Sequence, residues 1–210
     1  MCKVFLLAAL CTIATVFNCM AQAHYQPGYI VDLKGDTIRG MIDYKRWDRN
    51  PRKIEFKNSA ASSSSEFHPI QLKSFSVAHE IYEGAIVEVE ESPYKLNALD
   101  TCPTPIYARD TVFLQSLIRG EKSLLFLKDQ IAKRQFYTKE NNSYKHLLYK
   151  QYTSKTKESS KVVRENNEYK GVLALYLKDC PSMQEKLRRT TYTLASLTKV
   201  FEYYYECTGT

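Results

Sequence analysis

The chain has 210 residues and a formal net charge of +7, a length that fits one good core or two small subdomains sharing an interface. Basic residues between Lys34 and Lys199 are interspersed with acids, which is typical of a solvated surface and argues against a dedicated patch for an anionic partner. The seven glycines never cluster, which excludes a glycine-rich phosphate-binding loop.

The N-terminus has the pattern of a secretory signal peptide. Met1-Cys2-Lys3 is a short positive start, Val4–Val16 is almost entirely apolar, and Ala21-Gln22-Ala23 supplies the small residues of a cleavage site. The sequence therefore predicts a signal peptide at residues 1–23, cleaved after Ala23, and an exported protein of the periplasm or cell surface. The apolar run is short for a bilayer span, so no transmembrane span is expected after cleavage.

Cys19 offers an alternative, because a cysteine late in an apolar leader can be a lipid attachment site. Phe17 and Asn18 precede it, whereas a lipoprotein signal needs a small residue directly before the cysteine. Simple cleavage is the favoured interpretation over lipidation, and an uncleaved anchor is the least favoured. Export argues against a nucleic-acid partner despite the basic charge, and it favours an envelope protein, a glycan or an anionic surface.

The first elements expected after the leader are two strands joined by a tight turn. Tyr29–Leu33 is β-branched and aromatic, and Lys34-Gly35-Asp36 follows as a turn. Thr37–Tyr44 alternates with a period of two, so that one face carries Ile38, Gly40, Ile42 and Tyr44. The pattern predicts a β-hairpin.

Strand patterns continue to Tyr152, so residues 24–152 are predicted to form an antiparallel β-rich region. A strand is expected at Tyr82–Val89. Its inward residues are Ala85, Val87 and Val89, and Glu88 and Glu90 are expected to point outward. Loops are expected at Asn50-Pro51, at Ser59–Ser65, where a serine tract predicts mobility, and at Glu91–Pro105. Val112–Ile118 fits either a short helix or a strand. Further strands are expected at Ile54–Phe56, Phe75–Val77, Leu124–Leu127, Gln135–Thr138 and Leu147–Tyr152.

A connector and a helical region are predicted to complete the chain. Residues 153–162 are rich in Lys, Ser and Thr, and residues 163–210 show helical periodicity and are expected to pack on the β-rich part. The first helix is expected to start at Asn166 and to end at Pro181, and Ser182 and Glu185 match a capping box. A last helix over 191–206 should bury Leu194, Leu197, Phe201 and Tyr204. The predicted class is α+β, with strands first and helices last.

Three cysteines follow the leader, in a compartment where disulfides persist. Cys180 and Cys207 lie in the same helical region and are the favoured disulfide pair, which leaves Cys102 free or intermolecular. The sequence has no Cys-x-x-Cys pair, so neither a redox centre nor a structural zinc site is predicted.

No catalytic or cofactor motif stands out in the sequence. His24, His68, His79 and His146 are isolated from other ligand types, so no metal site and no cofactor are predicted. The sixteen tyrosines are the one compositional excess, and Tyr203, Tyr204 and Tyr205 stand in a row. They could form an aromatic binding surface, although ordinary amphipathic packing of a helix is the favoured explanation.

Several segments together resemble a group of exported, uncharacterised proteins common in Bacteroidetes-type bacteria. They are Gly28–Val31, Gly35–Gly40, Ile42–Tyr44, Trp47–Phe56, Phe113-Leu114 with Gly120, the Tyr169 helix ending at Asp179-Cys180, and the last tyrosines before Cys207. The resemblance implies an envelope setting and supplies no catalytic residues. Asp36-Thr37-Ile38 and Asp110-Thr111-Val112 also resemble the O-glycosylation sequon of such bacteria, which makes Thr37 and Thr111 candidate glycosylation sites.

The function predicted from these observations is a non-enzymatic binding or assembly module of the cell envelope. The alternative is a secreted hydrolase whose site is assembled from scattered residues such as His68, His79 and nearby acids, because triads converge from distant positions.

Overall fold

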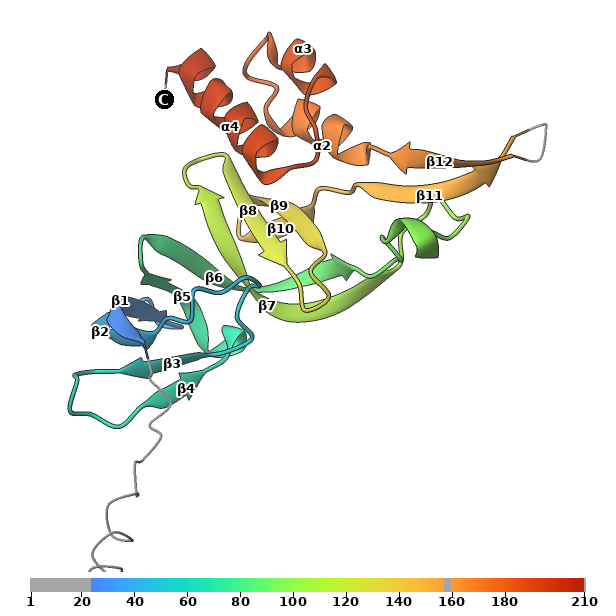
Figure 1. Cartoon of the computed structure of the whole chain (residues 1–210). Helices are drawn as coiled ribbons and strands as arrows, with labels where there is room; N and C mark the ends of the chain where they lie inside the picture. The colour runs from blue at the N-terminus through green and yellow to red at the C-terminus, as the bar shows by residue number, and fades with distance from the viewer. Residues whose placement is uncertain (1–23, 157–159, 210) are drawn as a thin grey trace, which may run out of the picture.

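The computed structural model describes residues 24–156 and 160–209; the predicted signal peptide, its cleavage site and Cys19 lie outside them. The fold is α+β, as the sequence predicts: an antiparallel sheet formed by the first two thirds of the chain precedes three helices (Figure 1). The helices are α2 (Glu168–Tyr176), α3 (Met183–Arg188) and α4 (Leu194–Thr208).

Ten strands form one sheet in the order β10-β9-β8-β7-β6-β5-β1-β2-β3-β4. Neighbouring strands are mostly consecutive in sequence, so the sheet is built largely of hairpins. The strands are β1 (Tyr25–Asp32), β2 (Thr37–Asp43), β3 (Ile54–Lys57), β4 (Ser65–Phe67), β5 (Leu72–Val77), β6 (Glu80–Glu90), β7 (Tyr107–Ile118), β8 (Ser123–Lys128), β9 (Arg134–Glu140) and β10 (Ser143–His146). Two short 3-10 helices, Pro69–Gln71 and Leu96–Ala98, lie in the connections.

The predicted hairpin is β1–β2, and its turn is fixed by one aspartate. The Asp32 carboxylate accepts hydrogen bonds from the backbone N–H groups of Lys34, Gly35 and Asp36 at 2.9, 2.8 and 2.9 Å. Gly35 has φ +104°, a conformation that favours glycine. On the face that Ile38 and Ile42 share, Ile42 is fully buried, whereas Ile38 near the turn is 39% exposed because the end of the hairpin reaches beyond the core.

The long strands β6 and β7 pair from Tyr82↔Gln115 to Glu90↔Tyr107 and are shared by two separate cores. The first core packs the N-terminal strands around Phe75, Tyr82 and Phe113. The second lies on one side of β6–β9 and contains Val87, Leu114, Leu125, Tyr137 and their neighbours. Val112–Ile118, which fits a helix or a strand by sequence, is part of β7. Phe113 belongs to the first core, and Val112 and Leu114 belong to the second.

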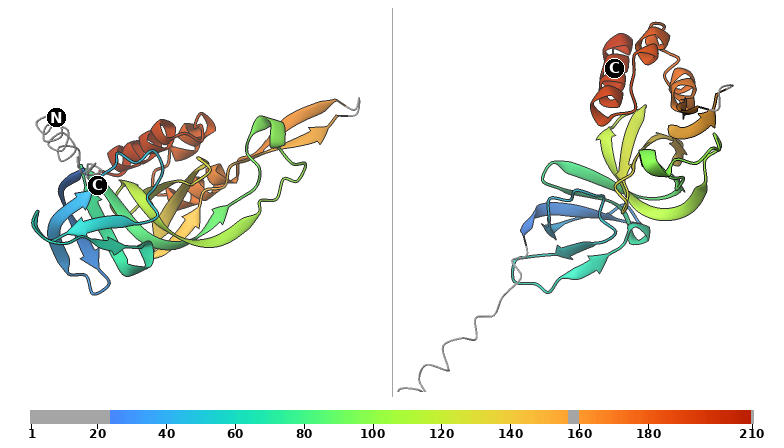
Figure 2. Two further views of the ribbon diagram at one scale, coloured as in Figure 1. Left: turned by 60° about the horizontal axis from the view of Figure 1, so that its bottom comes forward. Right: turned by 45° about the vertical axis from the view of Figure 1, so that its right-hand side comes forward.

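The third core lies between the other side of β8 and β9 and the helices. Leu124, Phe126 and Phe136 contact a cluster that includes Leu173 and Phe201. Both faces of β8 are therefore covered, which explains why Leu124–Leu127 is a continuous apolar run. Figure 2 shows the three helices grouped on this side of the sheet.

The helix boundaries differ from the predicted ones. The first helix ends at Tyr176 instead of Pro181, because Leu177 and Cys180 turn into the third core. Ser182 makes no capping hydrogen bond, so the capping-box prediction is wrong: its Oγ lies 2.6 Å from the Tyr203 hydroxyl. The last helix is capped by Thr193, which leaves Leu194 at its start and 40% exposed, contrary to the prediction.

The sequence predicts a connector at residues 153–162, but both ends of this segment belong to a second, two-stranded sheet. Strands β11 (Lys150–Lys155) and β12 (Lys161–Asn166) pair antiparallel and project away from the rest of the chain (Figures 1 and 2). The base of this hairpin is fixed to the β6–β7 loop, because the Thr153 N–H and hydroxyl both donate to the Asp100 carbonyl, at 2.8 and 3.0 Å. The polar composition of this segment predicts a connector, but strand-to-strand hydrogen bonds hold its polar residues in a hairpin.

The predicted disulfide pair is confirmed. The sulfur atoms of Cys180 and Cys207 lie at bonding distance, with Cα atoms 5.9 Å apart, and they join the α2–α3 connection to the end of α4. Cys102 is a free, exposed thiol in the β6–β7 loop. Closing a loop of this length restricts the unfolded chain and contributes about 3 kcal/mol to stability.

Candidate functional site: a cavity where two strands part

A cavity with apolar walls lies where β7 and β8 separate. The two strands pair from Ile118↔Leu124 to Gln115↔Phe126. Beyond that point β7 follows β6 as far as Glu90↔Tyr107, whereas β8 follows β9 as far as Lys128↔Arg134. The sheet therefore opens into a fork between the two strands.

Asn50, from the β2–β3 loop, fills the apex of this fork. Its side-chain amide donates to the Phe113 and Phe126 carbonyls, both at 2.9 Å, and its side-chain oxygen accepts from the Lys128 N–H at 2.9 Å. Its own N–H donates to the Lys128 carbonyl at 3.0 Å. The Asn50 side chain thus replaces the missing strand-to-strand hydrogen bonds, and it is buried.

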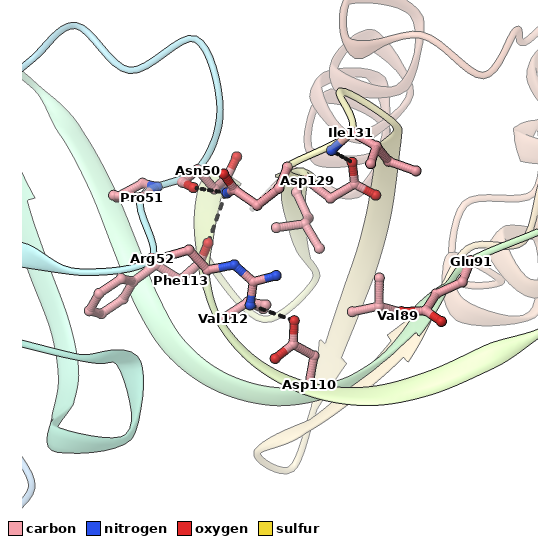
Figure 3. Close-up of a pocket in the computed structure, with 12 residues that line it drawn as sticks. Asn50, Pro51, Arg52, Val89, Glu91, Asp110, Val112, Phe113, Asp129 and Ile131 are labelled. Atoms are coloured by element: carbon pink, nitrogen blue, oxygen red, sulfur yellow. Dashed lines mark hydrogen bonds and ion pairs between the residues drawn. The ribbon is translucent and has the colours of Figure 1, made fainter. Parts of the chain in front are cut away.

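Below Asn50 the fork forms an open cavity with a volume of about 320 Å³, at the lower end of the range of ligand pockets (Figure 3). The apolar walls come from β6, β7 and β8, namely Val89, Val112, Phe113 and Leu127. The polar groups lie at the edge, and the side chain of Ile131, which is 58% exposed, stands at the rim. The cavity combines an apolar interior with a polar rim.

One ion pair marks the mouth of the cavity. The Arg52 guanidinium lies 2.6 Å from the Asp110 carboxylate, and both side chains remain partly exposed (Figure 3). Asp129, also in the lining, is satisfied within its own turn by the N–H groups of Ile131 and Lys133 at 3.0 and 2.9 Å. Arg52 and Asp110 are the groups that a ligand can recruit, because an exposed ion pair exchanges partners at little cost.

A buried ion pair lies behind the cavity and supports its wall. Glu90 was predicted to point outward, but it is 1% exposed and pairs with Lys133, whose ammonium also donates to the Ser92 carbonyl at 2.8 Å. Burial lowers the pKa of Lys133, and the Glu90 carboxylate opposes that shift. Gln135 completes the cluster by accepting from the Glu90 N–H at 2.8 Å. This cluster fixes β9 against the end of β6.

The histidines do not come together. His146 lies next to Tyr107, whose hydroxyl is 3.0 Å from Nδ1, and burial lowers the pKa of His146 to about 3, with Lys133 adding to the shift. The imidazole is therefore neutral near pH 7. His68 contacts Glu66 at 3.0 Å on the surface, and no hydroxyl or thiol joins them in the part of the chain that the structure describes. His79 is exposed at a tight turn.

The three consecutive tyrosines do not share one exposed face. Tyr204 is buried in the third core, and Tyr205 reaches the β7–β8 turn, where its hydroxyl donates to the Lys122 carbonyl at 2.7 Å. Tyr203 is half-buried and contacts Ser182. The geometry is that of amphipathic helix packing, the explanation that the sequence favours.

The two candidate glycosylation residues differ in exposure. Thr37 is exposed at the start of β2, whereas Thr111 is half-buried within β7. His24 and the other acids and histidines form no group of three or more that could hold a metal ion within residues 24–156 and 160–209. Over the same ranges, no helix combines the length and apolarity needed to cross a bilayer.

Sequence reasoning missed the residues that build this site. Asn50 is visible in the sequence only as part of a loop marked by Asn50-Pro51, and Lys133 only as one basic residue among many. Glu90 gave no signal either, because the alternation of its strand predicts that its side chain points outward. A comparison of the chain with known protein families, with curated proteins and with solved structures finds no match in any of the three.

Proposed function

We propose that the protein is an exported binding or assembly module of the cell envelope, without catalytic activity of its own. The leader pattern of residues 1–23 and the resemblance to exported Bacteroidetes-type proteins support the envelope setting. The Cys180–Cys207 pair is consistent with an oxidising compartment.

The observation that carries the binding role is the fork cavity. Its apolar walls and its polar rim resemble the pockets that receive an anchoring side chain at protein interfaces. The only aromatic ring in the lining belongs to Phe113, which is fully buried, so the cavity presents no flat ring on which a sugar could stack. We therefore infer a protein partner that inserts an apolar side chain into the cavity and places a polar group near Arg52 and Asp110.

Reversing the charge at the cavity mouth tests this proposal. Arg52→Glu places a second acid beside Asp110, and we expect it to reduce capture of a defined partner from an envelope extract at least about tenfold, because a rim charge pair becomes repulsive. Quantitative pull-down with mass spectrometry measures the change.

Lys53→Glu is the matched control. Lys53 is as exposed as Arg52, at 55% against 51%, and it forms a similar surface ion pair with Glu66 at 2.5 Å, outside the cavity lining. Equal capture by wild type and both variants would contradict the proposal, as would a loss of the same size in both variants.

A further inference from the structure

A groove between α3 and α4 collects cationic side chains. It has a volume of about 390 Å³ and contains three basic residues, Lys186, Arg189 and Lys199, against a single acid, Glu185. Lys186 lies in the last turn of α3, Arg189 directly follows that helix, and Lys199 comes from α4. The charges therefore converge from two segments of the chain onto one cavity.

These cations are weakly compensated. Arg189 lies 3.7 Å from Glu185, but both side chains are more than three-quarters exposed, at 86% and 76%, so the pair contributes little. The Lys186 ammonium lies 4.8 Å from the centre of the Tyr203 ring. Among the described residues, neither Lys186 nor Lys199 forms an ion pair. The groove therefore keeps an excess of positive charge.

Hydroxyl groups supply neutral donors within the same groove. The Ser196 Oγ accepts from the Thr191 N–H at 3.1 Å, which leaves its proton available to donate. The Ser182 Oγ and the Tyr203 hydroxyl are bonded to each other at 2.6 Å at the other end. A tetrahedral oxyanion can receive charge-assisted hydrogen bonds from ammonium and guanidinium groups together with a bond from a hydroxyl.

The disulfide holds the two walls of the groove together. Cys180 is 2% exposed, and its bond to Cys207 ties the connection that leads into α3 to the last turn of α4. Ser182, two residues later, lies with its Oγ 3.5 Å from the Cys180 sulfur. The walls are therefore preorganised, which lowers the entropic cost of ligand binding.

We propose that the α3–α4 groove binds a phosphate or sulfate ester through Lys186, Arg189 and Lys199. The proposal is independent of the fork cavity, because the two sites share no lining residue. On this proposal, the three cationic side chains of the groove serve to bind a compact, multiply charged anion.

Titration of the chain from His24 with inorganic phosphate and with sulfate, followed by amide NMR, tests the proposal. We expect saturable shifts confined to the α3–α4 groove, at Lys186–Thr190 and Ser196–Lys199. Lys199→Glu is expected to weaken the affinity about tenfold or more, because one attractive charge becomes repulsive. Lys95→Glu, the same change at an exposed lysine outside the groove, should leave the affinity unchanged.

The outcomes separate clearly. Shifts that do not saturate, or an equal loss of affinity in both variants, would show only diffuse attraction to a basic surface and would overturn the proposal. A phosphorylated monosaccharide and a phosphatidylglycerol vesicle then distinguish the source of the ester: competition by either with inorganic phosphate supports the site and identifies the source. Competition by neither would overturn it.

Discussion

Replacing Lys133 with methionine is expected to lower the free energy of unfolding by about 3–5 kcal/mol. The substitution leaves the Glu90 carboxylate buried without its cation and removes the hydrogen bond to the Ser92 carbonyl. An uncompensated buried charge costs far more than the pair itself contributes. Denaturant unfolding followed by tryptophan fluorescence measures the loss.

Two further variants separate the buried charge from loss of packing. Adding Glu90→Gln to Lys133→Met removes the unpaired charge, so the double variant should recover part of the stability. Lys53→Met, which breaks an exposed pair, should cost no more than about 1 kcal/mol. A double variant less stable than Lys133→Met would show that the pair is not the source of the effect.

Asn50→Ala is expected to destabilise the fold by about 3 kcal/mol, because it leaves the Phe113 and Phe126 carbonyls and the Lys128 N–H without their partner. The loss of stability should be greatest at the fork, so amide hydrogen exchange should accelerate at Lys128 and its neighbours in β8. The free energy of unfolding and the exchange rates together measure it. A change below about 1 kcal/mol would contradict the bridging role.

Asn50→Asp tests the two amide hydrogen bonds with a side chain of nearly the same size. It preserves the acceptor for the Lys128 N–H. The second carboxylate oxygen, however, faces the Phe113 and Phe126 carbonyls, which in the wild type accept hydrogen bonds from the Asn50 amide. When the aspartate is ionised the repulsion is largest, so the variant should be less stable at pH 7 than at pH 4, relative to wild type at each pH. No difference between the two pH values would indicate that the side chain has left the fork.

Local patterns were sufficient to predict much of the fold. The alternation in Thr37–Tyr44 gave the hairpin, since a half-buried strand must alternate, and the helical spacing after Tyr169 gave the C-terminal helices. The Cys180–Cys207 pair followed from their shared region. Each of these features depends on residues that are close in sequence or belong to one face of one element.

The fork could not be predicted, because it depends on contacts across the chain. Asn50 bonds to residues 63 and 76 positions away, and no local pattern marks such partners. Glu90 breaks the expected alternation for the same reason: its partner Lys133 lies 43 positions away, in the β8–β9 turn. The second hairpin was missed because Thr153 gains its strand partner and its Asp100 contact only in the folded chain.

The most direct test of the account is photo-crosslinking in the native host from a reactive amino acid placed at Ile131, on the rim of the fork cavity. Ile70 is the control, because it is equally exposed, at 56% against 58%, and lies outside the cavity lining. We predict one dominant crosslinked envelope protein from Ile131 that is absent from Ile70. The same crosslinks from both positions, or crosslinks only to cytosolic proteins, would contradict an exported module that binds its partner at the fork.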